Sequence, residues 1–246
     1  MPNYRLDLAY IGSNFHGYAS QPGIRTVQDE LETALFHHTG RVETAVAGRT
    51  DKGVHAVGQV VNFRCDTDLN QRRVMRSLNK QLAPDIAVTK IEIVSDDFHA
   101  RFSAMGRHYR YLILTRFAPD PFLAQTAWHY GSSLDIDAMN AAADRFVGEM
   151  DFASLCRRSG ETSTVRLVRR VKWYEIGPEL LCYEVEASSF CHQMVRSMVS
   201  LCVDVGRGKI DQSEVISILL ARDRGVGRGA APAHGLALMK VDYPSQ

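Results

Sequence analysis

The chain has 246 residues, of which 45% are hydrophobic and 23% charged, the composition of an ordinary globular protein. This length allows one large domain or two of about 100–150 residues, and the composition excludes disorder, collagen and coiled coil as the main architecture. The net charge of +1 excludes a uniformly basic nucleic-acid coat but allows a local basic groove. Only six of the 29 basic residues are Lys. This excess of Arg suits bidentate phosphate contacts, although a GC-rich genome would produce it too.

The five cysteines, at positions 65, 156, 182, 191 and 202, form no CxxC pair, and several lie within apolar runs. We therefore expect reduced core thiols in a cytoplasmic protein, without a disulfide scaffold or a zinc site. The first residues hold no apolar signal core, and no segment reaches transmembrane length, so no membrane association is expected.

The first half of the chain alternates strands with helices. Apolar side chains alternate with polar or small ones over residues 4–10, which predicts a half-buried strand. A glycine-punctuated loop follows, and Thr26 with Asp29 three positions later predicts the capped start of a helix. The remaining elements expected in this half are strands at 42–47, 58–65 and 86–94 and a helix at 70–82.

The second half uses the same kinds of element. We expect strands at 108–114, 165–176, 180–187 and 236–243, helices at 135–147 and 191–205, and a further helix that begins near 211–214. The glycine-rich stretch 225–229 is expected to be a flexible loop. This mixture favours an α/β (α+β) fold with a largely antiparallel or mixed sheet. The junction is placed near 100–107, which gives halves of 1–104 and 105–246.

Residues 47–56, Ala-Gly-Arg-Thr-Asp-Lys-Gly-Val-His-Ala, are the densest candidate for chemistry. Glycines allow the backbone to approach a ligand closely. Asp51 beside Arg49 would stay ionised, because a nearby cation lowers the pKa of a carboxyl group. An ionised carboxylate can act as nucleophile or base. A plain turn in which Asp51 is an Asx cap explains the same residues.

The usual cofactor and metal motifs are missing from the sequence. It contains no GxxxxGK[ST] phosphate loop, no GxGxxG fingerprint, and neither the HExxH nor the deaminase metal signature. The sequence therefore gives no reason to expect a metal or an organic cofactor.

Two segments are locally basic: residues 101–116, with interleaved aromatic side chains, and residues 153–172. On a regular strand Arg166, Arg170 and Lys172 share one face, which suits phosphate contacts and base stacking. The opposite face is then apolar and consists of Val165, Leu167, Val171 and Trp173. An ordinary solvated strand face remains the alternative reading.

Several ordered motifs together resemble the tRNA pseudouridine synthase A family. The core of the resemblance is Gly48–Ala56 with Gly58–Val61. Further matches are Phe15–Tyr18 with Gln21, Arg25–Gln28 with Leu31 and Glu32, Asp97–Ala104, Arg107–Tyr111, Phe190–Arg196 and His234–Leu236. The resemblance covers nearly the whole chain, and the ordered set is highly specific.

The resemblance implies an isomerase that converts uridine to pseudouridine at positions 38, 39 and 40 in the anticodon stem-loop of tRNAs. It also implies the pseudouridine synthase fold, in which two similar α/β halves share a sheet flanked by helices. The implied assembly is a homodimer with tRNA as its partner. No metal and no cofactor is implied, in keeping with the motif search.

The resemblance assigns roles residue by residue. Asp51 matches the catalytic aspartate, Tyr109 the tyrosine that stacks on the base, and Arg196 the arginine that pairs with the aspartate, while Arg49 lines the site. Whether the carboxylate attacks C1′, adds to the base or abstracts a sugar proton stays open. The basic residues expected to bind RNA are Arg107, Arg110, Arg166, Arg170 and Lys172.

This sequence departs from the family pattern at Ile11, Ala19 and Lys52, where the family commonly has Asp, Gln and Ala. None of these changes removes a candidate catalytic group. Two other functions remain open at this point: an RNA-binding protein that has lost its chemistry, and an unrelated aspartate-dependent hydrolase. The joint presence of Asp51, Tyr109 and Arg196 argues against the first. The lack of a second carboxylate or metal cluster near Asp51 argues against the second.

Overall fold

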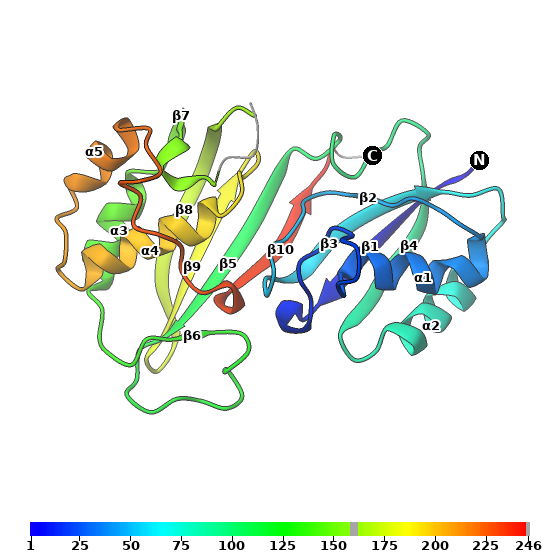
Figure 1. Ribbon diagram of the computed structural model, residues 1–246, viewed down its shortest axis with the longest axis horizontal. Helices are drawn as coiled ribbons and strands as arrows, with labels where there is room; N and C mark the ends of the chain where they lie inside the picture. The colour runs from blue at the N-terminus through cyan, green and yellow to red at the C-terminus, as the bar shows by residue number, and fades with distance from the viewer. Residues whose placement is uncertain (158–161, 245–246) are drawn as a thin grey trace. The chain divides into compact units, whose positions relative to one another are not determined.

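The computed structural model describes residues 1–157 and 162–244. The chain forms two compact units, Gly106–Ala237 and a unit made of Met1–Met105 with the segment that begins at Leu238 (Figure 1). Each unit holds a mostly antiparallel sheet with helices packed against it, so the expected mixed α/β class is confirmed. Within the described part of the chain, no helix is long and apolar enough to cross a membrane.

The sheet of the first unit has the strand order β4-β1-β3-β10, with β2 paired to β3. Strand β1 pairs antiparallel with both β3 and β4, and helix α2 packs on β4. The elements are β1 (Asn3–Tyr10), α1 (Val27–Thr39), β2 (Ala45–Val46), β3 (His55–Arg64), α2 (Gln71–Leu82), β4 (Ile86–Val94) and β10 (Leu236–Asp242). Strand β2 is therefore much shorter than the strand expected at 42–47.

Strand β1 and helix α1 form as the sequence predicts. The apolar side chains of β1 are buried and the intervening residues are only half-buried. At the start of α1, the Thr26 hydroxyl oxygen accepts the Asp29 N–H at 3.2 Å and donates to the Asp29 carboxylate at 2.5 Å. This reciprocal capping fixes where the helix begins.

Strand β10 lies far from β3 in sequence but beside it in the sheet. The approach is so close at Gly58 that a Cβ atom there would overlap the Met239 carbonyl oxygen. Only glycine fits such a position. The C-terminal strand, which the sequence placed with residues 105–246, therefore completes the first unit.

The sheet of the second unit has the order β5-β9-β8-β7, with β6 paired parallel to β5. Helix α3 packs on β8 and against α4. The elements are β5 (Gly106–Leu114), β6 (Trp128–His129), α3 (Ile136–Asp144), β7 (Gly148–Asp151), β8 (Val165–Gly177), β9 (Leu180–Ala187), α4 (Met194–Gly206) and α5 (Glu214–Leu220). Helix α4 begins three residues later than expected because Gln193 adopts a left-handed conformation, with φ 65°.

The expectation that Arg166 shares a strand face with Arg170 is wrong. The register between β8 and β9 shifts between Val168 and Arg170, which is the mark of a β-bulge. Residues before the bulge therefore point to the opposite side from the one that simple alternation predicts. Arg166 lies on the same side as buried Val168 and opposite to Arg170, while Leu167, expected to share a face with Val171 and Trp173, is 39% exposed.

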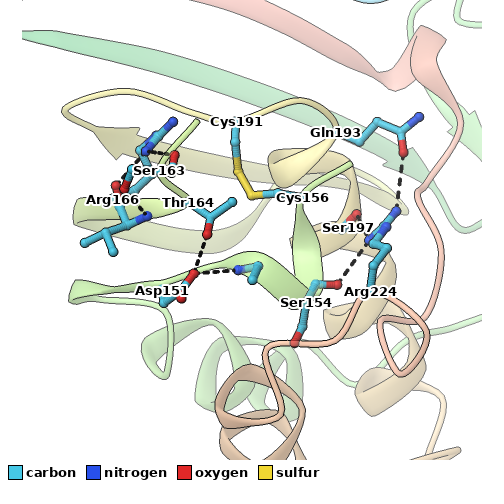
Figure 2. The surroundings of a disulfide bond; sticks show 12 residues. Asp151, Ser154, Cys156, Ser163, Thr164, Arg166, Cys191, Gln193, Ser197 and Arg224 are labelled. Atoms are coloured by element: carbon cyan, nitrogen blue, oxygen red, sulfur yellow. Dashed lines mark hydrogen bonds between the residues drawn. A yellow bond between two sulfur atoms is a disulfide. The ribbon is translucent and has the colours of Figure 1, made fainter. Parts of the chain in front are cut away.

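The expectation of reduced thiols throughout is also wrong for one pair. Cys156 and Cys191 form a disulfide, with a Cα–Cα distance of 5.7 Å (Figure 2). That separation lies within the range a disulfide can span. The two residues are 35 positions apart and outside regular elements, so their spacing gave no sign of the pairing. Cys65, Cys182 and Cys202 are buried free thiols, as expected.

Candidate active-site residues

The loop that carries Asp51 is held by the buried side chains of Tyr10 and Gln59, which belong to the first unit. The hydroxyl groups of Tyr10 and Thr50 are hydrogen-bonded at 2.8 Å. The Gln59 amide donates to the Tyr10 oxygen at 3.2 Å and to the Gly48 carbonyl at 2.8 Å. Burial raises the pKa of Tyr10 to about 12, although the bonds to Thr50 and Gln59 act against that shift. Tyr10 is therefore protonated at neutral pH, and its buried hydroxyl group holds Thr50 and Gln59 in place.

The glycine-rich loop before α1 closes on the same segment. Gly12 donates its N–H to His55 Nδ1 at 2.9 Å, which leaves the proton of a neutral His55 on Nε2. Tyr18 donates its N–H to the Thr50 carbonyl at 3.1 Å. Gly17 has φ +102°, a conformation that favours glycine, and a Cβ there would come within 2.9 Å of the Thr50 oxygen. The backbone on both sides of Asp51 is thus fixed by contacts within the first unit.

Asp51 itself is half-buried, between buried Thr50 and exposed Lys52. Its carbonyl accepts the Val54 N–H at 3.1 Å, which closes a tight turn. The Lys52 ammonium lies 3.1 Å from His16 Nε2, so it is held over the neighbouring loop. A carboxylate presented on a fixed loop has the preorganisation that nucleophilic or base catalysis needs.

The expected pairing of Arg49 with Asp51 is not formed. The Arg49 side chain is exposed and makes no ion pair within residues 1–157 and 162–244. Sequence proximity suggested the pair, but the turn leaves the guanidinium directed to solvent. Arg49 is therefore available to a ligand.

In the second unit, Tyr109 lies in the middle of β5, opposite Val185 of β9. Its half-buried ring meets Phe190 edge-on, with ring centroids 5.1 Å apart and an interplanar angle of 86°. Edge-to-face packing fixes the orientation of an aromatic ring. The sequence singled out Tyr109 but missed Phe190 as its support.

Arg196 lies in the first turn of α4 and is tied to one residue of the chain that precedes β10. Its Nε donates to the Ala231 carbonyl at 2.6 Å, and its own carbonyl accepts the Ala231 N–H at 3.0 Å. The neighbouring Tyr111 donates its hydroxyl to the Pro232 carbonyl at 2.7 Å. Burial raises the pKa of Tyr111, while Arg196 acts in the opposite direction. Arg196 is therefore held in place by backbone as well as by side-chain contacts.

The five basic residues expected to bind RNA do not share one surface. On β5, Arg107 is only 9% exposed and donates to the Ser188 carbonyl at 2.9 Å, on the same side of the sheet as Tyr109. Arg110, three residues further along the strand, lies on the other side and forms an ion pair with Glu184 at 3.2 Å.

Arg170 and Lys172 are exposed and lie on the Arg110 side of the sheet. Each faces an acidic residue across β9: Arg170 pairs in register with Glu186, and Lys172 with Glu184. The basic strand face expected from β8 alone is therefore a face of mixed charge. The acidic residues come from the neighbouring strand, which the pattern of one strand cannot reveal.

Arg224 is a further residue that the sequence did not single out. It belongs to the segment after α5, next to the glycine-rich stretch that was expected to be flexible. The structure instead shows a close fit, because a Cβ at Gly227 would overlap the Ser154 carbonyl oxygen. Asp223 also donates its N–H to the Ser154 hydroxyl at 3.1 Å.

With the fold and these residues established, the comparison with known proteins defines the class. The model of a family described as tRNA pseudouridine synthase matches residues 8–103 and 142–244. The chain belongs to the tRNA pseudouridine synthase family, which confirms the resemblance found in the sequence.

The curated relatives are full-length matches. The tRNA pseudouridine synthase A of Listeria monocytogenes is 39% identical over 247 residues, which cover 99% of this chain and 100% of that protein. The Bacillus subtilis protein of the same name is 41% identical over 243 residues, with 97% and 98% coverage. The one from a Thermotoga species is 39% identical, with 95% and 96% coverage.

Proposed function

We propose that this protein isomerises uridine to pseudouridine at positions 38, 39 and 40 in the anticodon stem-loop of tRNAs. The observation that carries the proposal is the match of the family and of its curated members over nearly the entire chain. The reaction breaks the N1–C1′ bond, turns the uracil and forms a C5–C1′ bond. The proton on C5 is lost and N1 gains one, so substrate and product are isomers and no redox or energy cofactor is consumed.

We assign the start of the reaction to Asp51, as the catalytic nucleophile. The fixed loop around it supports this assignment: Tyr10, Thr50 and Gln59 hold the backbone next to Asp51, so the loop loses little freedom when the carboxylate reacts. Attack on C1′, addition to the base and abstraction of a sugar proton are the three steps that such a group can perform.

Tyr109, Arg49 and Arg196 are proposed as substrate-binding residues. A target uridine in a stem must be extruded first, which costs a few kcal/mol. A flat ring such as Tyr109 can hold the detached uracil by stacking, and its packing on Phe190 supports that role. Arg49 and Arg196 supply positive charge for the sugar–phosphate or for the catalytic carboxylate.

The proposed contacts with the tRNA backbone are Arg107, Arg110, Arg166, Arg170 and Lys172. Arg170 and Lys172 are expected to contribute most, because they are exposed while Arg107 is buried. We further propose that the protein works in the cytoplasm as a homodimer. A chain of this length is small beside a tRNA, and symmetric pairs are the commonest soluble oligomers.

The experiment that tests this function maps pseudouridine in tRNA after incubation with the wild-type protein and with Asp51→Asn. We expect the wild type to modify positions 38, 39 and 40 and the variant to bind tRNA without modifying it. Asn keeps the shape of the side chain but cannot supply an ionised carboxylate. The matched control is Asp68→Asn, since Asp68 is exposed and lies in another loop. Modification by Asp51→Asn at the wild-type rate would refute the assignment of Asp51.

A further inference from the structure

Arg224 reaches from the segment after α5 to the start of α4, where its guanidinium is held by three oxygens (Figure 2). Its Nη1 donates to the Ser197 hydroxyl at 2.9 Å and to the Ser154 carbonyl at 3.3 Å. Its Nη2 donates to the Gln193 side-chain oxygen at 3.3 Å. All three acceptors are uncharged.

No carboxylate balances this charge. Within residues 1–157 and 162–244, no Asp or Glu oxygen lies within 4 Å of the Arg224 guanidinium. The neighbouring carboxylates have other partners: Asp151 lies 3.5 Å from Arg222, and Asp223 accepts the Gly225 N–H at 2.8 Å. A half-buried cation without a counter-ion is costly to maintain, and an anionic ligand would remove that cost.

A second arginine raises the local positive potential. Burial lowers the pKa of Arg224, and the charge of Arg196 lowers it further. Both residues lie in the second unit and both border the first turn of α4, which contains no acidic residue and no side-chain cap. The helix N-terminus adds a partial positive charge to that of the two guanidinium groups.

Two N–H groups of the Arg224 guanidinium are not used in these three hydrogen bonds. Arginine has five N–H groups, and the three hydrogen bonds above leave the Nε–H and one Nη2–H without a protein acceptor among the described residues. This side-on pair of donors matches two oxygens of a phosphate group.

We propose that Arg224, next to Arg196, binds a backbone phosphate of the tRNA. The inference rests on the proposed function, because that function supplies the RNA. Arg224 is then a substrate-binding residue held at a fixed angle by Ser154, Ser197 and Gln193. It would set the position of the backbone near the residue proposed to act with the catalytic carboxylate.

The test measures tRNA affinity against salt for the wild type, Arg224→Gln, Arg224→Lys and the control Arg222→Gln. Each lost phosphate contact lowers the slope of log K against log salt by about 0.7–0.9. We expect Arg224→Gln to show that decrease. Arg224→Lys keeps a point charge and should keep most of the slope, and Arg222→Gln should match the wild type. A wild-type slope in folded Arg224→Gln, or equal loss in Arg222→Gln, would overturn the proposal.

A second measurement uses the wild-type protein, so its result does not depend on whether a variant folds. Phenylglyoxal modifies accessible arginines, and mass spectrometry reads the extent at each one. We expect bound tRNA to protect Arg224 while Arg222 stays reactive, and inorganic phosphate at the same ionic strength to protect it far less. Arg224 equally reactive with and without tRNA overturns the proposal, and protection by phosphate alone overturns RNA as the source of the anion. A wild-type protein that binds no tRNA refutes the proposed function as well, which separates the two failures.

Discussion

The hydroxyl of Tyr10 lies 2.8 Å from the hydroxyl of Thr50, so a residue of β1 directly supports the residue that precedes Asp51. Gln59 of β3 completes the contact by donating to the same tyrosine oxygen. The candidate catalytic loop is therefore supported by two adjacent strands of the first unit. The hydrogen bonds that hold it are made within the protein.

Replacing Tyr10 with Phe should lower both stability and activity. The change leaves the Thr50 hydroxyl and the Gln59 amide short of a buried partner, which costs about 1–3 kcal/mol of unfolding free energy. Urea unfolding measures the stability, and single-turnover modification of tRNA measures the activity. The control is Tyr4→Phe, since Tyr4 is a buried tyrosine of the same strand whose hydroxyl bonds to Thr67 and Leu69 instead. It should lose stability but keep the rate, and an equal loss of rate would contradict the role of Tyr10 in placing Asp51.

Alkaline pH should destabilise the protein partly through Tyr10. Burial raises the pKa of Tyr10 from 10.0 to about 12, so the folded state holds the proton more tightly than the unfolded chain. The corresponding stability is fully present below pH 10 and is lost as the pH rises toward 12. Unfolding free energies measured across this window should fall less steeply for Tyr10→Phe than for the wild type. Parallel curves would show that Tyr10 does not contribute to the alkaline loss.

Substitutions at Tyr109 should separate its ring from its hydroxyl. Base–aromatic stacking is worth about 1–3 kcal/mol per base, so Tyr109→Ala should lose that much transition-state stabilisation. Tyr109→Phe keeps the stacking face and its packing on Phe190, and should retain far more activity. Single-turnover rates with saturating enzyme decide between the two. An equal loss in both variants would assign the function to the hydroxyl.

On the sheet face where Arg170 and Lys172 lie opposite Glu186 and Glu184, removing positive and negative charges should change tRNA affinity in opposite directions. Removing Arg170 and Lys172 together, as Gln, should weaken tRNA binding and flatten its salt dependence. Removing the facing charges with Glu184→Gln and Glu186→Gln should strengthen binding, because less negative charge then opposes the phosphates. Affinities measured at several salt concentrations provide both readouts. Binding that is indifferent to all four changes would place the RNA on another surface.

The proposed homodimer predicts complementation between damaged subunits. An Asp51→Asn subunit mixed with one that lacks Arg166 and Arg170 should regain activity at one site, provided that each site draws arginines from both chains. Light scattering provides the independent check. A stable and fully active monomer would refute the dimer and assign the whole site to one chain.

Local pattern was enough to predict most elements of the fold. The alternation of β1 and the capping pair Thr26 and Asp29 are decided by neighbours a few residues away, and both appear as predicted. The boundary of α4 was missed because it depends on the left-handed backbone of Gln193, a conformation that residues other than glycine rarely adopt. The bulge in β8 was missed because it exists only with respect to the register of β9.

The site residues divide in the same way. Asp51 and Tyr109 were found because they belong to dense motifs, whereas Phe190 and Arg224 act through partners distant in sequence. The pairing of Arg49 with Asp51 was inferred from adjacency along the chain, which does not determine where a side chain in a turn points. Contacts between distant segments are the information that a single sequence lacks.

Because β10 lies beside β3, the first unit is assembled from two segments that are far apart in the sequence. During synthesis, the edge of β3 that pairs with β10 stays largely open until β10 leaves the ribosome, because β2 covers only a short part of that edge. Gly106–Ala237 is continuous and emerges earlier, so it can fold first although it is the later half in sequence order. A chain that stalls before Leu238 would carry an open strand edge, the kind of surface that invites aggregation and removal by cellular quality control.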